Sequence, residues 1–244
     1  MSETLKRQVA LVTGAGRGIG AATARLFAQR GAMVVLASRS ESEVQRVADE
    51  INGEGTGRRA LAVPTDVSQE DQVIRLFEAA KARFGPVDIL FNNAAVVEVC
   101  DFVEMELPAW EEVMGVNVRG AFLCCREAFR QMIAGKKGGA IINMASLSGV
   151  RGPEKFKGLS SYVVSKYGVL GLSEILAVEG KPYGIRVNSI APGAVDTAML
   201  KKAAPFLKTK IRPEDIARTV LFLADDAQSG HISGANIEIF SNDL

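Results

Sequence analysis

The feature that most constrains this chain is a regular alternation of short, mostly apolar runs with longer amphipathic segments. The apolar runs cover 9–12, 33–37, 60–63, 87–91, 140–144, 185–190 and 236–240. Such runs are typical of strands buried on both faces, as in parallel sheets covered by helices. The segments between them predict helices, among them 41–52, 68–84, 108–134, 160–180 and one beginning near 212. The sequence therefore predicts an α/β fold with a doubly wound, seven-stranded parallel sheet and helices on both faces.

Composition narrows the classes of partner. Hydrophobic residues make up 48% of the 244 residues and charged ones 23%, as in a soluble globular protein. A net charge of +1 offers no overall field that would attract nucleic acid or an anionic membrane. The first residues lack a secretory pattern and no apolar run approaches the length of a membrane span, so we expect a cytoplasmic protein. No linker-like stretch interrupts the chain, which predicts a single domain over 1–244.

Cysteine and histidine are too sparse for several kinds of site. The three Cys form no C-x-x-C pair, and Cys124 and Cys125 are neighbours in a helical pattern, so we expect them to be buried. His231 is the one His in the sequence, which leaves neither a zinc site nor a Ser-His-Asp triad with enough material. No metal is expected.

A glycine-rich turn joins the first predicted strand to the first helix. It reads Thr13-Gly14-Ala15-Gly16-Arg17-Gly18-Ile19-Gly20. Glycine allows the backbone to approach a pyrophosphate, and a helix N-terminus offers free amides with a partial positive charge. The turn therefore predicts a dinucleotide site of the Rossmann type, with Gly14, Gly18 and Gly20 as its glycines and Ile19 among them.

The second predicted strand ends in Ser38-Arg39. An acidic residue at this point would bond the ribose hydroxyls of NAD, whereas Arg would neutralise the 2′-phosphate of NADP. No carboxylate occupies the position, and Arg17 is a second cation directed at the same region. The pattern favours NADP(H), with NAD(H) as the alternative; a solvated Arg39 would explain the residue equally simply.

Tyr162 and Lys166 stand four residues apart in a predicted helix and therefore share one face of it. A neighbouring ammonium favours the phenolate, so Lys166 is expected to lower the pKa of Tyr162 toward neutral pH. This would make Tyr162 an acid–base catalyst.

Taken in order, seven such elements resemble the single-domain branch of the short-chain dehydrogenase/reductase family, over essentially the whole chain. They are Thr13-Gly14-x-x-x-Gly18-x-Gly20, Asp66-Val67, Asn92-Asn93-Ala94-Ala95, Asn117, Ser146, Tyr162-x-x-x-Lys166 and Pro192-Gly193-Ala194-Val195-Asp196-Thr197. The pattern Ser-x-x-Gly selects Ser146 over Ser148 as the family's serine. The resemblance implies an enzyme that acts on CH–OH donors with a nicotinamide cofactor.

The resemblance also implies a role for each residue. Tyr162 would exchange a proton with a carbonyl oxygen, Ser146 would hold that oxygen, Lys166 would hold the nicotinamide ribose, and Asn117 would anchor a water. Asp66 and Val67 would contact the adenine, while Asn93 and Ala94 would line the adenosine ribose. Pro192, Gly193, Val195 and Thr197 belong to the motif at the nicotinamide end, followed by a short substrate lid over about 198–211.

The resemblance is strongest to 3-oxoacyl-thioester reductases, so the expected substrate is a small carbonyl or alcohol compound, such as a thioester-linked acyl chain. Alternatives are an alcohol, sugar-alcohol or hydroxysteroid dehydrogenase, and, more remotely, a non-catalytic dinucleotide-binding module. An enlarged loop over 153–158 carries Lys155 and Lys157 on either side of Phe156; these could meet an anionic substrate or lie in solvent. Helices 108–134 and 160–180 would form a homotetramer or homodimer.

Overall fold

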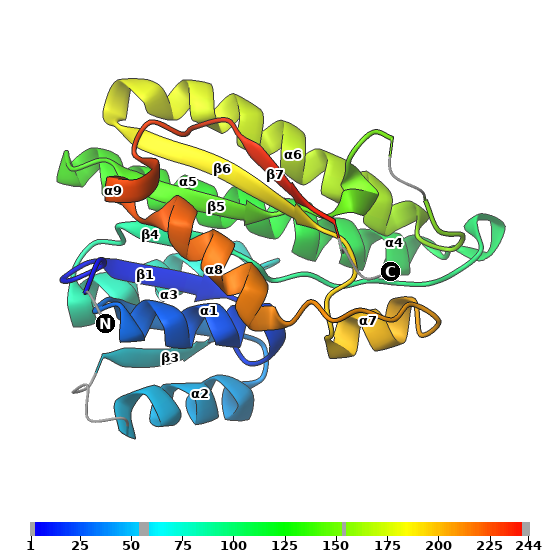
Figure 1. Cartoon of the computed structure of the whole chain (residues 1–244), viewed down its shortest axis with the longest axis horizontal. Helices are drawn as coiled ribbons and strands as arrows, with labels where there is room; N and C mark the ends of the chain where they lie inside the picture. The colour runs from blue at the N-terminus through cyan, green and yellow to red at the C-terminus, as the bar shows by residue number, and fades with distance from the viewer. Residues whose placement is uncertain (1–2, 54–58, 153–154, 241–244) are drawn as a thin grey trace.

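A computed structural model describes residues 3–53, 59–152 and 155–240, and these residues contain one twisted sheet (Figure 1). All of its strand pairs are parallel, in the order β3-β2-β1-β4-β5-β6-β7. The strands are β1 Val9–Thr13, β2 Met33–Ser38, β3 Ala60–Pro64, β4 Ile89–Asn92, β5 Gly139–Met144, β6 Ile185–Pro192 and β7 Asn236–Ile239. The predicted α/β fold with a seven-stranded parallel sheet is confirmed, and its strand order is Rossmann-like.

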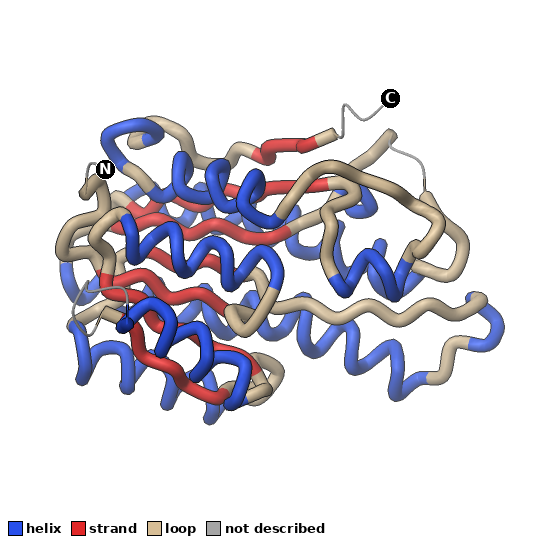
Figure 2. The backbone as a smooth tube through the Cα atoms, turned by 60° about the horizontal axis from the view of Figure 1, so that its bottom comes forward, coloured by secondary structure: helices blue, strands red, loops and turns tan. Residues whose placement is uncertain are grey.

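Helices cover both faces of this sheet (Figure 2). One face packs against α1 Gly18–Gln29, α2 Glu41–Gly53 and α8 Pro213–Ala224, and the other against α3 Glu70–Phe84, α5 Gly120–Gly135 and α6 Ser160–Gly180. Shorter helices are α4 Leu107–Met114, α7 Ala198–Ala203 and α9 Asp226–Ser229. Among the described residues, no helix is both long and apolar enough to cross a membrane.

The buried strands explain why the sequence lacks polar alternation. Ala10 and Val12 of β1 face the core beneath α1 and α8, while Val9 and Leu11 face the core beneath α3 and α5. Because both sides of the strand are covered, every residue of β1 is buried. Cys124 and Cys125 of α5 lie in the second of these cores, as expected for small apolar side chains.

The predicted helix 108–134 is not a regular helix. It consists of α4, a π-helical segment at Gly115–Arg119 and α5. In the π-helical segment the amide of Gly120 donates to the carbonyl of Gly115, five residues back. The added residue shifts the side chains that follow around the helix axis, which apolar periodicity could not reveal because both helical faces remain partly buried.

The sheet topology creates an opening at one end. The chain winds outward from β1 to β3 and then returns to start again at β4, beside β1. At such a switch point the connections after the two central strands leave in opposite directions, and a crevice forms at their carboxyl ends. The turn after β1 and the segment after β4 both lie at this end, as does α7 (Figure 1).

Gly20 is needed where α1 packs against the turn that precedes it. A Cβ at this position would lie 2.3 Å from the main-chain oxygen of Gly14 and 2.6 Å from Nδ2 of Asn93. We expect Gly20→Ala to lower the free energy of unfolding by about 1–3 kcal/mol, since main-chain atoms must shift to admit the methyl group. Urea denaturation of the variant and the parent protein measures the change.

Gly135→Ala is the matched control. Gly135 lies in the last turn of α5, and no described atom is within 4 Å of the Cβ that Ala would add. This substitution should leave stability unchanged or raise it by up to about 1 kcal/mol, because Ala favours the helix. An equal decrease in the free energy of unfolding in Gly20→Ala and Gly135→Ala would contradict the packing argument.

Candidate active site

Hydrogen bonds from the side chains of Thr13 and Asn93 join the ends of β1 and β4 at the switch point. The Thr13 hydroxyl accepts from the amides of Asn93 and Ala94, both at 3.0 Å. In return, Nδ2 of Asn93 donates to the main-chain oxygens of Thr13 at 3.0 Å and of Gly14 at 3.1 Å. The side-chain amide of Asn93 therefore holds the glycine turn in place. Gly14 has φ +63°, and a Cβ there would meet Ala94 at 2.9 Å.

The glycine turn leaves room for a ligand above it. Gly18 has φ +55°, a conformation that favours glycine, and the nearest atom to a Cβ built on it is Cγ2 of Thr197 at 3.6 Å. Helix α1 begins at Gly18, and its N-cap residue Arg17 makes no side-chain capping bond. Free amides at a helix N-terminus and an accessible backbone suit the pyrophosphate of a dinucleotide. The turn therefore fits the cofactor that the sequence predicts.

The carboxyl end of β2 lies beside this turn, and ion pairs surround it. Arg17 pairs with Glu43 at 3.6 Å, and Arg39 pairs with Glu112 of α4 at 3.4 Å. Ser38 donates to the main-chain oxygen of Ser40. The sequence placed no carboxylate at the end of β2, but the fold brings Glu43 there from the first turn of α2. Helix α2 starts directly after β2, which could have signalled this.

Asp66 and Val67 follow β3, on the far side of the same crevice. One carboxylate oxygen of Asp66 accepts from the amide and the hydroxyl of Ser68, at 2.9 and 2.8 Å. Val67 is buried against Gly120. A Cβ added to this glycine would lie only 2.7 Å from a methyl group of Val67. These bonds fix the direction of the segment that would line the adenine.

The residues after β6 divide into buried and accessible groups. Pro192 and Val195 are buried, and Val195 packs in the core beneath α1 and α8. Gly193 is half-buried and donates its amide to Ile239 of β7. Thr197 caps α7 and lies over Gly18. Thr197 is thus the residue of this motif whose side chain faces the glycine turn, whereas the side chain of Val195 is directed into the protein.

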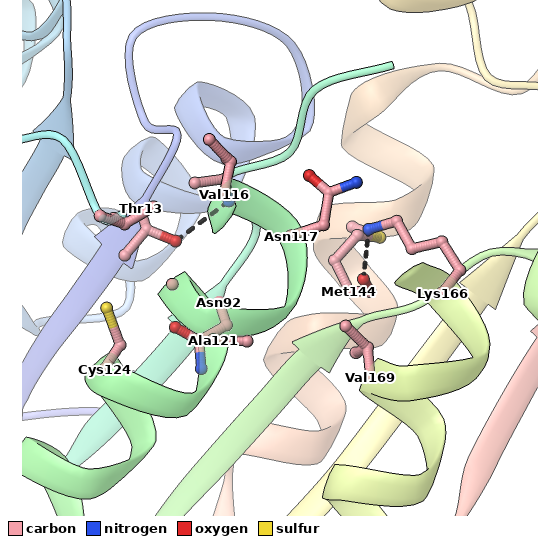
Figure 3. A pocket seen from close by; sticks show the side chains of 12 residues that line it. Thr13, Asn92, Val116, Asn117, Ala121, Cys124, Met144, Lys166 and Val169 are labelled. Carbon is pink, nitrogen blue, oxygen red and sulfur yellow. Dashed lines mark hydrogen bonds between the residues drawn. The ribbon is translucent and has the colours of Figure 1, made fainter. Parts of the chain in front are cut away.

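Tyr162 and Lys166 share one face of α6, as their spacing predicts. Nζ of Lys166 lies 5.5 Å from the centre of the Tyr162 ring. It donates a 2.8 Å hydrogen bond to the main-chain oxygen of Met144, at the end of β5 (Figure 3). Lys166 is almost completely buried, and this burial lowers its pKa to about 7.

The expected effect of Lys166 on Tyr162 is wrong for the protein without ligands. Burial raises the pKa of Tyr162, and the hydrogen bond with the Ser146 side chain lowers it to a smaller extent. The physical reason is that desolvation disfavours the phenolate, while Lys166 directs its amino group toward a carbonyl. Tyr162 is therefore held as a neutral phenol that can donate a proton.

The side chain of Ser146, the serine that the Ser-x-x-Gly pattern selects, is hydrogen-bonded to Tyr162. Ser146 lies two residues after the end of β5 in extended conformation, and its hydroxyl also accepts from the amide of Ser148 at 3.2 Å. The short helical turn Leu147–Gly149 packs on α6, because a Cβ on Gly149 would lie 2.6 Å from the main chain of Lys166. This close packing brings the ends of β5 and α6 together.

Asn117 lies in the π-helical segment and is buried. Its side-chain oxygen accepts from the amide of Val96 at 2.8 Å, and its nitrogen donates to the carbonyl of Val96 at 2.9 Å. The same nitrogen donates to the Ser165 hydroxyl at 3.0 Å. A small cavity beside it is lined by Lys166, Asn92 and Thr13 among others (Figure 3). The side chain of Asn117 thus joins α6 to the segment after β4.

Three segments meet around the site and are tied to one another. Lys202 of α7 donates to the carbonyl of Val97 at 3.2 Å and pairs with Glu98 at 3.3 Å. Lys157 pairs with Asp101 at 2.8 Å. Phe156 packs edge-on against Phe206, with ring centres 5.8 Å apart. The predicted lid segment around α7, the segment after β4 and the loop before α6 therefore contact each other pairwise.

The lysines of the enlarged loop are engaged in these contacts. Lys155 donates to the carbonyls of Leu147 and Val150, at 3.2 and 2.6 Å, and Lys157 forms the pair with Asp101. In this arrangement neither amino group is free to meet an anionic substrate. Residues 153 and 154 of the predicted loop lie outside the described residues.

Comparison with known proteins gives a consistent result. Residues 8–208 match the family model described as short chain dehydrogenase. The chain is 39% identical to a cis-4-hydroxycyclohexanecarboxylate dehydrogenase of Sinomonas cyclohexanicum, covering 94% of each chain. It is 35% identical to a 3-oxoacyl-[acyl-carrier-protein] reductase of Synechocystis, covering 96% of each.

The chain belongs to the short-chain dehydrogenase/reductase family. A crystal structure of a 3-ketoacyl-(acyl-carrier-protein) reductase from Brucella melitensis, complexed with NADH, superimposes with a TM-score of 0.88 at 34% identity. The match covers 96% of this chain and 97% of that one. As a member of the family, this short-chain dehydrogenase/reductase is an oxidoreductase of the CH–OH group that acts on a small alcohol or carbonyl compound with a nicotinamide dinucleotide.

The buried Lys166 of this dehydrogenase/reductase should reduce its stability. In the unfolded chain the lysine keeps a pKa of about 10.4, whereas burial lowers the pKa in the folded protein to about 7. At pH 6 the folded protein therefore holds a desolvated ammonium. We expect Lys166→Met to raise the free energy of unfolding there by about 1–3 kcal/mol, as measured by urea denaturation.

The pH dependence distinguishes charge from packing. Between pH 7 and 10 the unfolded chain binds the proton more strongly, so the stability of the parent protein rises with pH and the advantage of Lys166→Met shrinks. Lys181→Met removes an exposed lysine and should show no such trend. A constant advantage across this pH range would contradict the assigned burial effect.

Proposed function

We propose that this protein is an NADP(H)-dependent carbonyl reductase that acts on 3-oxoacyl thioesters, with Tyr162 as the acid–base group. The observation that carries the proposal is the contact between the hydroxyls of Tyr162 and Ser146, beside the buried Lys166 and the β1–β4 crevice. A phenol kept neutral next to a second hydroxyl is suited to protonating an oxygen as negative charge develops on it.

The side chains divide the work as follows. The nicotinamide, when bound, supplies the hydride to the carbonyl carbon or accepts it in the reverse direction. Tyr162 donates its proton to the carbonyl oxygen, and Ser146 donates a hydrogen bond to the same oxygen. Lys166 holds the nicotinamide ribose, and its charge stabilises the phenolate that remains. Because burial raises the pKa of Tyr162, its side chain is a neutral phenol that holds the proton which carbonyl reduction requires.

Asn117 contributes in two ways in this proposal. Its side chain is fully used in bonds to Val96 and Ser165, so it fixes the position of α6 relative to the segment after β4. A water that relays protons to Lys166 would therefore bind the main chain of Asn117 and not its amide group.

The preference for NADP(H) rests on Arg17 and Arg39. Both guanidinium groups lie at the end of β2 and are mostly exposed, and each is held by a single long ion pair. Such pairs contribute little to stability, so a 2′-phosphate can replace the carboxylates as partner. In the related Brucella melitensis protein the bound dinucleotide is NADH, which makes NAD(H) the alternative.

The acyl-thioester class is supported by the Synechocystis relative and by two exposed lysines, Lys136 and Lys137, at the end of α5. These offer positive charge to an acidic carrier protein. The second candidate is a dehydrogenase of cyclic or other secondary alcohols, which the Sinomonas cyclohexanicum relative favours. A non-catalytic dinucleotide-binding module is disfavoured, since Tyr162, Ser146 and Lys166 lie together.

A homotetramer or homodimer is part of the proposal. Exposed apolar side chains gather on α5 and α6, namely Phe122, Ile133, Val164, Tyr167, Ile175 and Val178. Apolar surface of this kind on two long helices favours association between copies of the chain.

The main test follows the absorbance of the reduced nicotinamide during incubation with a panel of substrates. We expect NADPH to be consumed fastest with acetoacetyl thioesters, compared with cyclic ketones, steroid ketones and sugars. Tyr162→Phe should lower kcat by about 10²–10⁴-fold, because the proton donor is lost, and leave the Kd for NADP⁺ nearly unchanged.

Tyr167→Phe is the control, since Tyr167 lies on the same helix and is exposed. It should retain the parent activity. Full turnover by Tyr162→Phe would refute the assigned mechanism, and faster oxidation of cyclic alcohols than reduction of thioesters would favour the second candidate.

Arg39→Asp tests the cofactor preference. Replacing the cation by an anion should lower the NADPH-to-NADH ratio of kcat/KM by at least about tenfold, since the 2′-phosphate would lose its counter-charge. Arg75→Asp, an exposed arginine of α3 on the other face of the sheet, should leave the ratio unchanged. If both variants behave alike, the assignment of Arg39 is wrong.

A further inference from the structure

Glu43 lies closer to the glycine turn than the sequence suggests. A Cβ built on Gly16 would lie 2.7 Å from Cβ of Glu43, 2.9 Å from its carboxylate oxygen Oε2 and 3.3 Å from Oγ of Ser38. The glutamate side chain therefore packs directly on the backbone of Gly16, at the end of β2. Because glycine has no Cβ, residue 16 leaves space for this carboxylate.

Several contacts hold Glu43 in this position. It stands in the first turn of α2, where a negative charge is favoured by the helix dipole, and its amide donates a 3.4 Å hydrogen bond to the Ser40 hydroxyl oxygen. Arg46, one turn further along α2, donates to the main-chain oxygen of Gly16 at 3.1 Å. The Arg46 bond thus joins α2 to the glycine turn one helical turn beyond the carboxylate.

The arginines near this carboxylate lie at different distances from it. Oε1 of Glu43 is 3.6 Å from Arg17, whereas Arg39 is directed away to Glu112 of α4. Arg46 forms a second, short pair with Glu50. Glu43 is consequently the acidic group packed against the glycine turn itself, and Arg17 is the cation that it shares with any anionic ligand there.

We propose that Glu43 sets the discrimination between NAD(H) and NADP(H) in this protein, acting from α2 and not from the end of β2. Its carboxylate accepts hydrogen bonds from an adenosine ribose with free hydroxyls. It repels a 2′-phosphate and competes with that phosphate for Arg17. This inference rests on the proposed use of a nicotinamide dinucleotide, and it limits the NADP(H) preference that Arg17 and Arg39 produce.

Glu43→Gln tests the inference, because glutamine keeps the shape of the side chain and removes its charge. The measurement is the Kd of NAD⁺, NADP⁺, 5′-AMP and 2′,5′-ADP by titration calorimetry, which does not depend on turnover. We expect NADP⁺ and 2′,5′-ADP to bind about tenfold more tightly, since a like charge is removed near the phosphate. NAD⁺ and 5′-AMP should bind equally well or a few-fold more weakly.

Glu41→Gln is the matched control. Glu41 belongs to the same first turn of α2 but is exposed, so the two variants lose the same helix-dipole interaction. The Kd ratio of NAD⁺ to NADP⁺ should remain at the parent value in Glu41→Gln. An equal change in both variants, or an unchanged ratio in Glu43→Gln, overturns the inference.

A second variant separates charge from packing. Glu43→Asp keeps the charge but withdraws it by one methylene. Its Kd ratio of NAD⁺ to NADP⁺ should therefore lie between the ratios of the parent protein and Glu43→Gln. A ratio equal to that of Glu43→Gln would mean that packing on Gly16 decides the selectivity, contrary to the proposal. If the parent protein bound neither NAD⁺ nor NADP⁺, the proposed function itself would fail, which is a different result from an unchanged ratio.

Discussion

The hydrogen bonds between the ends of β1 and β4 are the interaction on which the rest of the site depends. At the switch point of the sheet these strands are neighbours, yet their connections diverge, so the crevice has to be closed at its base. Thr13 and Asn93 do this with hydrogen bonds between their side chains and the main chain at the end of the other strand. These hydrogen bonds fix the position of the glycine turn on one side and of the segment leading to Val96 on the other. Through Val96 it reaches Asn117 and therefore α6, which carries Tyr162 and Lys166.

Stability and chemistry compete at Lys166. A lysine buried against a main-chain carbonyl lowers the stability of the fold at neutral pH, and no packing argument explains its presence. The same burial gives it a pKa close to neutrality, and its amino group lies 5.5 Å from the centre of the Tyr162 ring. Tyr162 responds in the opposite sense, because desolvation keeps its phenol neutral. Two groups with pKa values moved in opposite directions form a suitable pair for proton transfer.

The crevice has two ends with different physics. At the proposed adenosine end, the exposed Arg17 and Arg39 form long ion pairs with Glu43 and Glu112, and such pairs contribute little to stability. In the proposal, cofactor choice at this end therefore depends on charge balance. At the proposed substrate end, the segment containing α7, the segment after β4 and the loop before α6 contact one another through lysine pairs and an aromatic pair. Selectivity at that end depends on how these contacts rearrange around a substrate.

The sequence by itself determined the fold class and the order of its elements. Apolar runs without polar alternation, each followed by a helical segment, are typical of strands in a parallel sheet that is covered on both faces. Motif spacing brought Tyr162 and Lys166 to one helical face and selected Ser146. Only the tertiary structure decided how the groups act: the π-helical segment that turns Asn117 toward Val96, the raised pKa of Tyr162, and the approach of Glu43 to Gly16. The physical reason is that periodicity and spacing describe neighbours along one element, whereas desolvation and charge balance depend on side chains from elements far apart in the chain.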